Sequence, residues 1–220
     1  IAVFEKYNQQ QQEHTGKRVL YAVNLTGPVT QLVEKAKQFS KAGASCLLLN
    51  VIPYGFDVLH RISADPDVNV PIIAHPAFTG SFYPSPYYGL SAPLLLGKLM
   101  RLSGADIVLF PSPYGSVAMP KDEALDLAYQ LQSPNSIHLP TFPTPSAGIH
   151  PGLVPSIIRD FGDNIIINAG GGIHGHPQGT TAGGKAFTDA IRATISGQTL
   201  AKAAENSAEL RSAIHKWGAQ

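Results

Sequence analysis

The chain has 220 residues, with 16 Lys and Arg against 15 Asp and Glu, so its formal net charge at pH 7 is only +1. A nearly neutral chain has no strong electrostatic attraction for nucleic acid or an anionic membrane, and we expect neither as a partner. The 21 glycines and 18 prolines argue against a helical bundle or a coiled coil. Only 14% of the residues are charged, which predicts that another domain or subunit covers part of the surface.

A single cysteine, Cys46, excludes an internal disulfide, and no secretory signal is recognisable, so we expect a cytoplasmic protein. The most apolar runs, 46–52 and 107–110, are far shorter than the ~20 residues that span a bilayer. The chain starts at Ile1 and not at a methionine, from which we expect a piece of a longer protein.

Helical and strand-like segments alternate along the sequence. Residues 1–14 have the spacing of a polar helix that ends at Gly16, with the glutamine run 9–12 on a solvated face. Short apolar runs follow, typical of parallel strands whose two faces are both covered. The predicted strands are 19–25, 46–51, 70–74, 106–110, 137–144 and 165–168, and the further predicted helices are 28–43, 57–64, 92–102, 121–132, 151–161, 186–195 and 200–217.

This alternation predicts an α/β fold with right-handed crossovers, which both an open doubly wound sheet and a TIM barrel possess. Polar residues and glycines gather just after the strands, where a barrel builds its active site. Barrels often bind phosphate with the loops after the seventh and eighth strands. If the loops at Ser146 and Gly170 are those two, the chain contains strands three to eight of a (β/α)8 barrel, and residues 1–220 form one partial barrel domain.

The two loops differ in what they offer to a phosphate. Gly170, Gly171 and Gly172 directly follow the last predicted strand, and glycines let backbone N–H groups approach a phosphate without a Cβ in the way. Ser146 and Gly148 in the preceding loop add a hydroxyl and another accessible N–H. The alternative is that the glycines only make tight turns.

Four histidines follow the predicted strands: His75, His150, His174 and His176. The His-x-His pair could bind zinc, but no Asp or Glu lies between residues 164 and 184 to complete such a site. A structural, hydrogen-bonded role is the commoner one for each, and His75, at the end of an apolar strand, is the strongest functional candidate. The remaining features have simpler interpretations: a solvated helix face for Lys98, Arg101, Lys185 and Arg192, and a loop at 82–88 that covers a site or forms an interface.

Several longer motifs resemble one known family. They are Tyr21–Gly27 (YAVNLTG), Ile73–Ala77 (IAHPA), Leu94–Leu99 (LLLGKL), Phe110–Val117 (FPSPYGSV), Pro145–Gly152 (PSAGIHPG) and Asn168–Pro177 (NAGGGIHGHP). In this order they resemble the ribulose-bisphosphate carboxylase (RuBisCO) superfamily, and within it the RuBisCO-like branch of 2,3-diketo-5-methylthiopentyl-1-phosphate enolases of methionine salvage. The resemblance extends over essentially the whole chain.

The resemblance implies a fold, a substrate and its binding residues. The fold is the RuBisCO C-terminal type of TIM barrel, and the substrate is a phosphorylated diketone. By position, Gly148, Gly170 and Gly171 would bind the phosphate with Ser146 beside them, and His75 would contact the substrate near its reacting carbons. Members of the family pair their active sites across a homodimer, so the resemblance also implies a dimer.

Two departures separate this chain from the carboxylases of the family. Carboxylases carry a lysine in the loop after the sixth strand, whereas residues 111–119 contain none, and Pro76 replaces an arginine that binds a second phosphate. Without these cations, carboxylation of a bisphosphate loses electrostatic support, while enolisation of a monophosphate does not. The resemblance therefore implies a keto–enol isomerase.

The family's metal site and base are not in this sequence. Family members bind Mg2+ with a carbamylated lysine, an Asp and a Glu from a Lys-x-Asp-Glu run, and a lysine acts as the base. Neither the run nor the N-terminal domain is present here. We therefore expect no catalytic residue and no metal ligand in these 220 residues, and no turnover by them alone. Two alternatives remain open: another RuBisCO-like sugar-phosphate isomerase or decarboxylase, and a non-catalytic phosphate-binding module.

Overall fold

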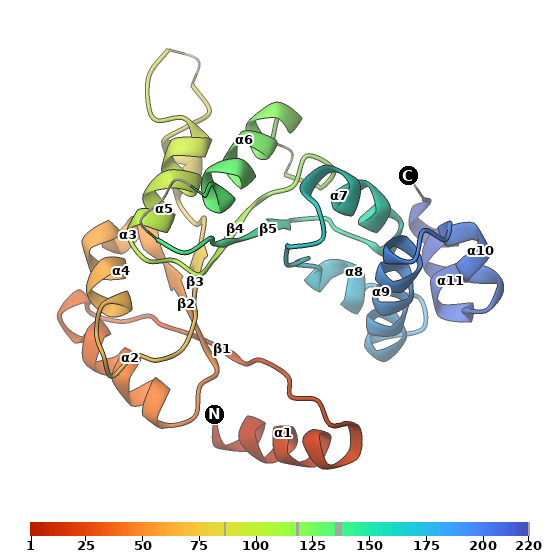
Figure 1. Ribbon diagram of the computed structural model, residues 1–220, viewed down its shortest axis with the longest axis horizontal. Helices are drawn as coiled ribbons and strands as arrows, with labels where there is room; N and C mark the ends of the chain where they lie inside the picture. The colour runs from red at the N-terminus through yellow and green to blue at the C-terminus, as the bar shows by residue number, and fades with distance from the viewer. Residues whose placement is uncertain (86, 118, 135–137, 220) are drawn as a thin grey trace. The chain divides into compact units, whose positions relative to one another are not determined.

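A computed structural model of the chain describes residues 1–85, 87–117, 119–134 and 138–219. Its five strands form one sheet in the order β1-β2-β3-β4-β5, so strands that follow one another in sequence are neighbours. The first three of these pairs are parallel, and helices connect the strands along the chain (Figure 1). The strands are β1 (Ala22–Asn24), β2 (Cys46–Asn50), β3 (Ile72–His75), β4 (Ile107–Pro111) and β5 (Phe142–Ser146). The predicted α/β alternation is confirmed.

Helices and short helical turns make up most of the remainder. The N-terminal helix ends where Gly16 adopts a left-handed conformation with φ 70°, as the sequence predicts. The helical elements are α1 (Ala2–Thr15), η1 (Val29–Gln31), α2 (Leu32–Lys41), α3 (Val51–Tyr54), α4 (Phe56–Ser63), η2 (Thr79–Ser81), the π-helical η3 (Pro93–Lys98), α5 (Leu99–Leu102), α6 (Lys121–Gln132), η4 (Pro151–Leu153), α7 (Val154–Phe161), α8 (Gly170–His174), α9 (Thr180–Ile195), α10 (Leu200–Glu205) and α11 (Ala208–Trp217).

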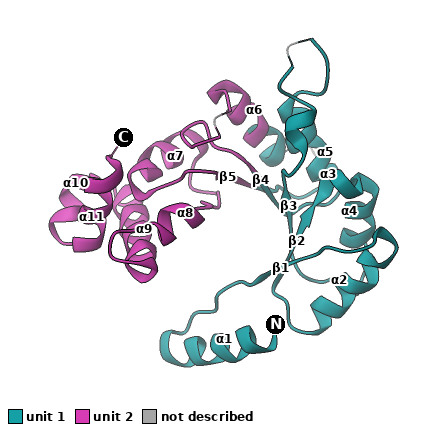
Figure 2. Cartoon of the chain, turned by 180° about the vertical axis from the view of Figure 1, so that it is seen from behind, with its two compact units in different colours: residues 1–109, 129–142 teal, residues 110–128, 143–220 magenta. Residues whose placement is uncertain are grey.

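The chain divides into two compact units, coloured separately in Figure 2. Unit 1 contains residues 1–109 and 129–142, and unit 2 contains residues 110–128 and 143–220. None of the helices in the described ranges has the length and apolarity that a membrane crossing requires.

The core of unit 1 lies on both faces of β2 and β3. Leu47 and Leu49 are fully buried on one face of β2, and Cys46, whose side chain points to the other face, is also buried. The helix α2 adds Leu32 and Ala36, which are four residues apart and lie on one buried face. The register of β2 and β3 pairs Asn50 with His75, so two polar residues end neighbouring strands side by side.

In unit 2, the helices α7, α9, α10 and α11 pack against one another. The ring of Phe161 at the end of α7 meets that of Phe110 edge-on, with centroids 5.8 Å apart. On α9, Ala186, Phe187 and Ala190 form a buried face with helical spacing. These contacts hold the segments that follow β4 and β5.

The prediction that Arg101 lies on a solvated helix face is wrong. Its side chain is only 3% exposed, and its guanidinium donates to four backbone carbonyls of unit 1. Nε donates to the carbonyl of Leu139 (3.1 Å), Nη1 to those of Gln130 (3.2 Å) and Ser133 (2.8 Å), and Nη2 to that of His138 (2.9 Å). The arginine is buried because its planar fork of donors satisfies the carbonyl groups around the end of α6.

The predicted last strand, 165–168, is an extended segment and not a regular strand. The N–H groups of Ile166 and Asn168 donate to the carbonyls of Pro143 and Pro145, at 3.1 and 3.4 Å. Proline has no N–H to donate in return, so β5 supplies only half of a normal ladder. The prolines of β5 thus explain why only five of the six predicted strands form.

Several further boundaries differ from the predictions: β1 is shorter than the predicted 19–25, and α9 begins at Thr180 and not at 186. The fifth strand occupies Phe142–Ser146, later than the predicted 137–144, of which residue 137 lies outside the described ranges. The single terminal helix predicted for 200–217 is two helices, because the hydroxyl of Ser207 accepts from the N–H of Leu210 at 3.1 Å and starts a new helix. The same hydroxyl donates to Asp189 on α9 at 2.7 Å.

Candidate functional site

The candidate phosphate site in unit 2 starts where β4 and β5 end. The N–H of Ser112 donates to the carbonyl of Ser146 at 2.8 Å, and both residues are buried. The hydroxyl of Ser146 donates to the carbonyl of Phe110 at 3.0 Å. The proton of this predicted binding residue is therefore already used within the protein, which leaves Ser146 as an acceptor and a support for the loop.

The loops after β4 and β5 touch backbone to backbone. A Cβ at Gly115 would overlap the carbonyl oxygen of Ala147, and a Cβ at Gly148 would lie 2.5 Å from the backbone nitrogen of Ser116. Ala147 and Gly148 both have left-handed backbones, with φ 71° and 73°. Glycine is thus required at 115 and 148 by close approach, and at 148 also by conformation.

The three consecutive glycines form the first turn of the short helix α8, although the sequence predicts a loop there. Gly172 is buried, and a Cβ on it would overlap the carbonyl oxygen of Ile149. Gly170 and Gly171 are exposed, and a Cβ on either would meet nothing within 4 Å. The first N–H groups of a helix have no partner inside it. Gly172 therefore packs α8 onto the loop after β5, while Gly170 and Gly171 leave open space beside the first N–H groups of the helix.

His75 lies in unit 1 at the end of β3, within the strand and not just after it. Its ring is half-buried, and its Nδ1 accepts from the N–H of Ala77 at 3.1 Å. Burial lowers the pKa of the imidazole, which favours the neutral form. With Nδ1 accepting, Nε2 carries the proton and can donate to a ligand.

In the loop predicted at 82–88 to cover a site or form an interface, the side chains of Tyr87 and Tyr88 are 91% and 78% exposed.

The other three histidines have local, structural surroundings. His174 contacts the hydroxyl of Thr180 at 3.2 Å, and buried His176 contacts the carbonyl of Glu209 at 2.9 Å. The ring of His150 stacks on that of Trp217, with centroids 5.8 Å apart and planes inclined by 17°. Burial lowers the pKa of His150, and its Nδ1 is buried without a hydrogen-bond partner in the described ranges.

The end of α11 supports the glycine-containing loops of unit 2. The Trp217 ring packs against two imidazoles, because the ring of His176 also lies near it, tilted by 57° with centroids 6.3 Å apart. Lys216 sits over the Trp217 ring and donates to the carbonyl of Gly175 at 2.6 Å. A Cβ at Gly152 would overlap the carbonyl oxygen of Gly218. Only the residue type of Trp217, the single tryptophan, could have pointed to this role from the sequence.

The remaining candidate cations are exposed as predicted: Lys98, Lys185 and Arg192. Lys185 pairs with Glu209 at 2.8 Å, and this partner raises the pKa of the lysine. Within the described ranges, no group of three or more His, Cys, Asp or Glu side chains lies close enough together to hold a metal ion. The described residues therefore do not fit Mg2+.

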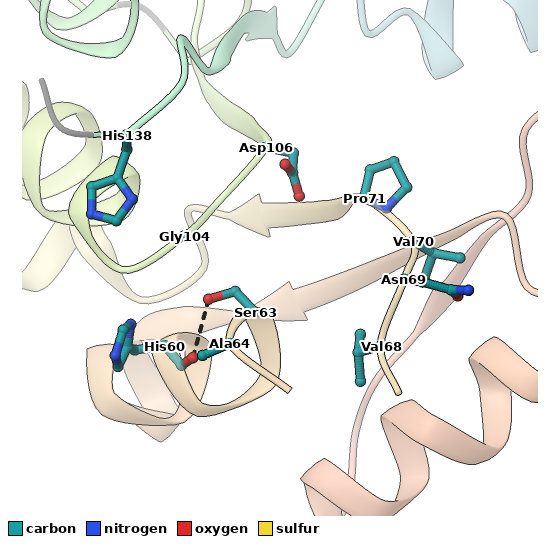
Figure 3. Close-up of a pocket in the computed structure, with 10 residues that line it drawn as sticks. All are labelled: His60, Ser63, Ala64, Val68, Asn69, Val70, Pro71, Gly104, Asp106 and His138. Atoms are coloured by element: carbon teal, nitrogen blue, oxygen red, sulfur yellow. Dashed lines mark hydrogen bonds between the residues drawn. The ribbon is translucent and has the colours of Figure 1, made fainter. Parts of the chain in front are cut away.

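A pocket in unit 1 lies at the amino ends of β3 and β4, opposite the carboxyl ends after which the predicted site residues follow (Figure 3). Pro71 and Asp106, which immediately precede β3 and β4, line it together with His60, Ser63 and His138. The carboxylate of Asp106 accepts from the N–H of Ile72 at 2.8 Å, and burial raises its pKa. Because this pocket is at the amino ends of the strands, it contains none of the predicted site residues.

Comparison with known proteins identifies the class of this fold. Residues 117–217 match the family model "Ribulose bisphosphate carboxylase large chain, catalytic domain". The structure superposes on an octameric RuBisCO of Pyrococcus horikoshii with a TM-score of 0.90 and 33% identity, over 97% of this chain and 51% of that one. The chain has a RuBisCO-like α/β fold with a parallel five-stranded sheet.

Similarity is higher to one branch of RuBisCO-like proteins. The chain is 54% identical over 211 residues to the 2,3-diketo-5-methylthiopentyl-1-phosphate enolase of Geobacillus thermodenitrificans, over 96% of this chain and 51% of the relative. It is 52% identical to the enolase of the same name from Bacillus licheniformis, over 94% of this chain and 51% of the relative. The structure also superposes on a RuBisCO-like protein (MtnW) from Alicyclobacillus acidocaldarius with a TM-score of 0.92 and 50% identity, over 97% of this chain and 53% of that one.

These findings confirm the resemblance that the sequence motifs indicate. The chain is a homologue of these enolases over nearly all of its own length, and it spans about half the length of the curated relatives it matches.

Proposed function

We propose that this chain is the phosphate-binding part of a RuBisCO-like 2,3-diketo-5-methylthiopentyl-1-phosphate enolase of methionine salvage. The observation that carries the proposal is the different packing of the glycines. Gly170 and Gly171 are exposed with open space beside them, while Gly172, their neighbour, is buried by backbone contact. The start of a helical turn whose glycines are kept free of neighbours is suited to an anion held by backbone N–H groups. The identity of about 50% to proteins named as this enolase supports the substrate.

The residues have separate roles in this proposal. Backbone N–H groups of Gly148, Gly170 and Gly171 bind the phosphate, and Ser146 holds the first of these loops against Phe110. His75 contacts the substrate near its reacting carbons and donates from Nε2. Holding the phosphate in fixed positions aligns the carbon that loses its proton, which lowers the entropic part of the barrier.

The reaction is a keto–enol isomerisation. A base removes a proton from the carbon next to a carbonyl, the electron pair of that C–H bond forms a C=C bond, and the carbonyl oxygen takes up a proton to give the enol form of the diketone, with the phosphate unchanged. In the family, the base is a lysine and Mg2+ stabilises the enolate. The described residues do not fit this metal, so we assign its ligands and the base to the part of the longer protein that this chain does not span. The isolated 220-residue chain should therefore not turn over substrate.

We further propose that the strands of this chain correspond to strands three to eight of a (β/α)8 barrel, with the extended segment 165–168 in place of the eighth. The longer protein would be a cytoplasmic homodimer. One of the solved relatives is described as a dimeric archaeal RuBisCO, from Hyperthermus butylicus.

A test uses the longer protein that contains this chain. Gly171→Ala adds a methyl group that, beyond its own helix, meets no atom of the described residues within 4 Å, so folding should be unaffected while the methyl group occupies phosphate space. We expect KM for the phosphorylated diketone to rise on the order of tenfold or more. The matched control is Gly184→Ala on α9, which also meets nothing within 4 Å and should leave KM unchanged.

Two results would contradict the proposal. An unchanged KM for the Gly171→Ala enzyme would remove the glycines from the binding site. Turnover by the purified 220-residue chain, with no longer species present, would show that the base and metal site are not located elsewhere.

A further inference from the structure

Ser116, which belongs to the motif Phe110–Val117 but is not among the predicted site residues, lies beside the loop of Gly148 in unit 2. A Cβ at Gly148 would lie 2.5 Å from the backbone nitrogen of Ser116 and 3.1 Å from its Oγ. Both polar atoms of the serine are therefore on the side of the loop that faces Gly148. Ser116 itself is exposed, so a ligand can reach it.

The loop that carries Ser116 is anchored at several points. The N–H of Ser112 donates to the carbonyl of Ser146, and the hydroxyl of Ser112 accepts from the N–H of Tyr114 at 3.2 Å. Gly115 lies directly against the carbonyl oxygen of Ala147. These contacts fix the part of the loop that directly precedes Ser116, which restrains the serine before a ligand binds.

A phosphate monoester at this loop needs hydrogen-bond donors. The Ser146 hydroxyl gives its proton to the Phe110 carbonyl, so it can donate to a phosphate only by breaking that bond. The run 111–117 contains no Lys or Arg to supply a cation. Ser116 offers a hydroxyl and a backbone N–H beside Gly148, and both are neutral donors of the kind that bind phosphate oxygens.

We propose that Ser116 binds the phosphate group of the substrate through its hydroxyl and completes the Gly148 side of the phosphate site. This inference rests on the proposed function, which it deepens by adding a binding residue from a third loop. The ligand class is a phosphate monoester. Neutral donors on this side can bind one phosphate group, and the run 111–117 supplies no cation for a second one.

The experiment compares Ser116→Ala and Ser116→Thr in the longer protein. Two quantities are measured: KM and kcat for the phosphorylated diketone, and the dissociation constant of inorganic phosphate by calorimetry. Losing a hydrogen bond to a charged group weakens binding on the order of tenfold. We expect Ser116→Ala to raise both KM and the phosphate dissociation constant by about this factor, with a smaller change in kcat, and Ser116→Thr to restore both. The control Ser196→Ala, at an exposed helix end in unit 2, should change neither.

The outcomes separate this inference from the proposed function. Phosphate binding that weakens in Ser116→Ala, in a protein that does not turn over the diketone, would support Ser116 and refute the enolase assignment. Normal KM and phosphate affinity in an active Ser116→Ala enzyme would refute the role of Ser116 alone. A wild-type protein that binds no inorganic phosphate and shows the same KM as Ser116→Ala would likewise overturn it.

Discussion

Replacing Arg101 by methionine tests whether a buried arginine holds the end of α6 in unit 1. Methionine keeps an unbranched side chain but removes the charge and every donor. Four backbone carbonyls then lose their hydrogen bonds: those of Gln130, Ser133, His138 and Leu139. All four acceptors are backbone oxygens, so the substitution removes these bonds without taking a hydrogen-bond partner from another side chain.

The expected loss follows from two opposing contributions. Each hydrogen bond from a charged donor contributes about 1.5–3 kcal/mol when measured by mutation. Against this sum, removing a buried guanidinium also removes its desolvation cost, and carbonyls near the surface regain water. Leu139 is 87% exposed, so its neighbourhood is close to solvent. We expect Arg101→Met to lower the free energy of unfolding by about 2–4 kcal/mol.

Urea unfolding of the protein, followed by circular dichroism, measures this difference at constant m. Arg101→Lys is the second variant: its compact ammonium cannot span four carbonyls, so the loss should be intermediate, about 1–2 kcal/mol. Lys98→Met removes an exposed cation from the same helical stretch and should stay within about 0.5 kcal/mol of the wild type. If Arg101→Met behaved like Lys98→Met, the four bonds would not stabilise the fold and the reasoning would fail.

Three further predictions concern packing, protonation and reactivity. Gly172→Ala should destabilise the protein by about 2–4 kcal/mol in urea unfolding, because the new Cβ overlaps a backbone oxygen, whereas Gly171→Ala should not; equal stabilities would contradict this. Burial lowers the pKa of His150, so stability should decline as the pH falls below the unfolded-state value of about 6.5, and His150→Phe, which keeps a ring against Trp217, should flatten part of that decline in thermal melts at pH 5 and 7.5. Burial and the nearby Asp106 carboxylate raise the pKa of Cys46 to about 11, so mass spectrometry should find its peptide unlabelled by iodoacetamide at pH 8 until urea is added; rapid labelling of the folded protein would refute it.

The sequence predicts the order of strands and helices well because the signals are local. Leu47 and Leu49 lie in an apolar run bounded by helical segments, and such runs identify buried parallel strands. The break at Ser207 was missed, because an apolar periodicity that continues through 200–217 hides a serine cap. Residues 165–168 were predicted as a strand and are an irregular extended segment, because the prolines that disrupt the ladder belong to another strand, β5. Arg101 shows the same limit: its carbonyl partners lie about 30 to 40 residues further along the chain.

The glycines show why a site cannot be resolved further from residue types alone. Gly170, Gly171 and Gly172 are identical and adjacent in the sequence, yet a Cβ on the third overlaps backbone while the first two have open space. Helical geometry causes the difference, because successive residues of α8 point about 100° apart around its axis, so one of three must face the loop after β5. A triple glycine can therefore serve two purposes at once: one residue brings the helix against its neighbouring loop, and two keep its exposed end clear. The same division applies at Gly148, where close approach to Ser116 needs a glycine even without a ligand. Substitutions that separate fold stability from phosphate affinity, residue by residue, are thus the decisive measurements for this site.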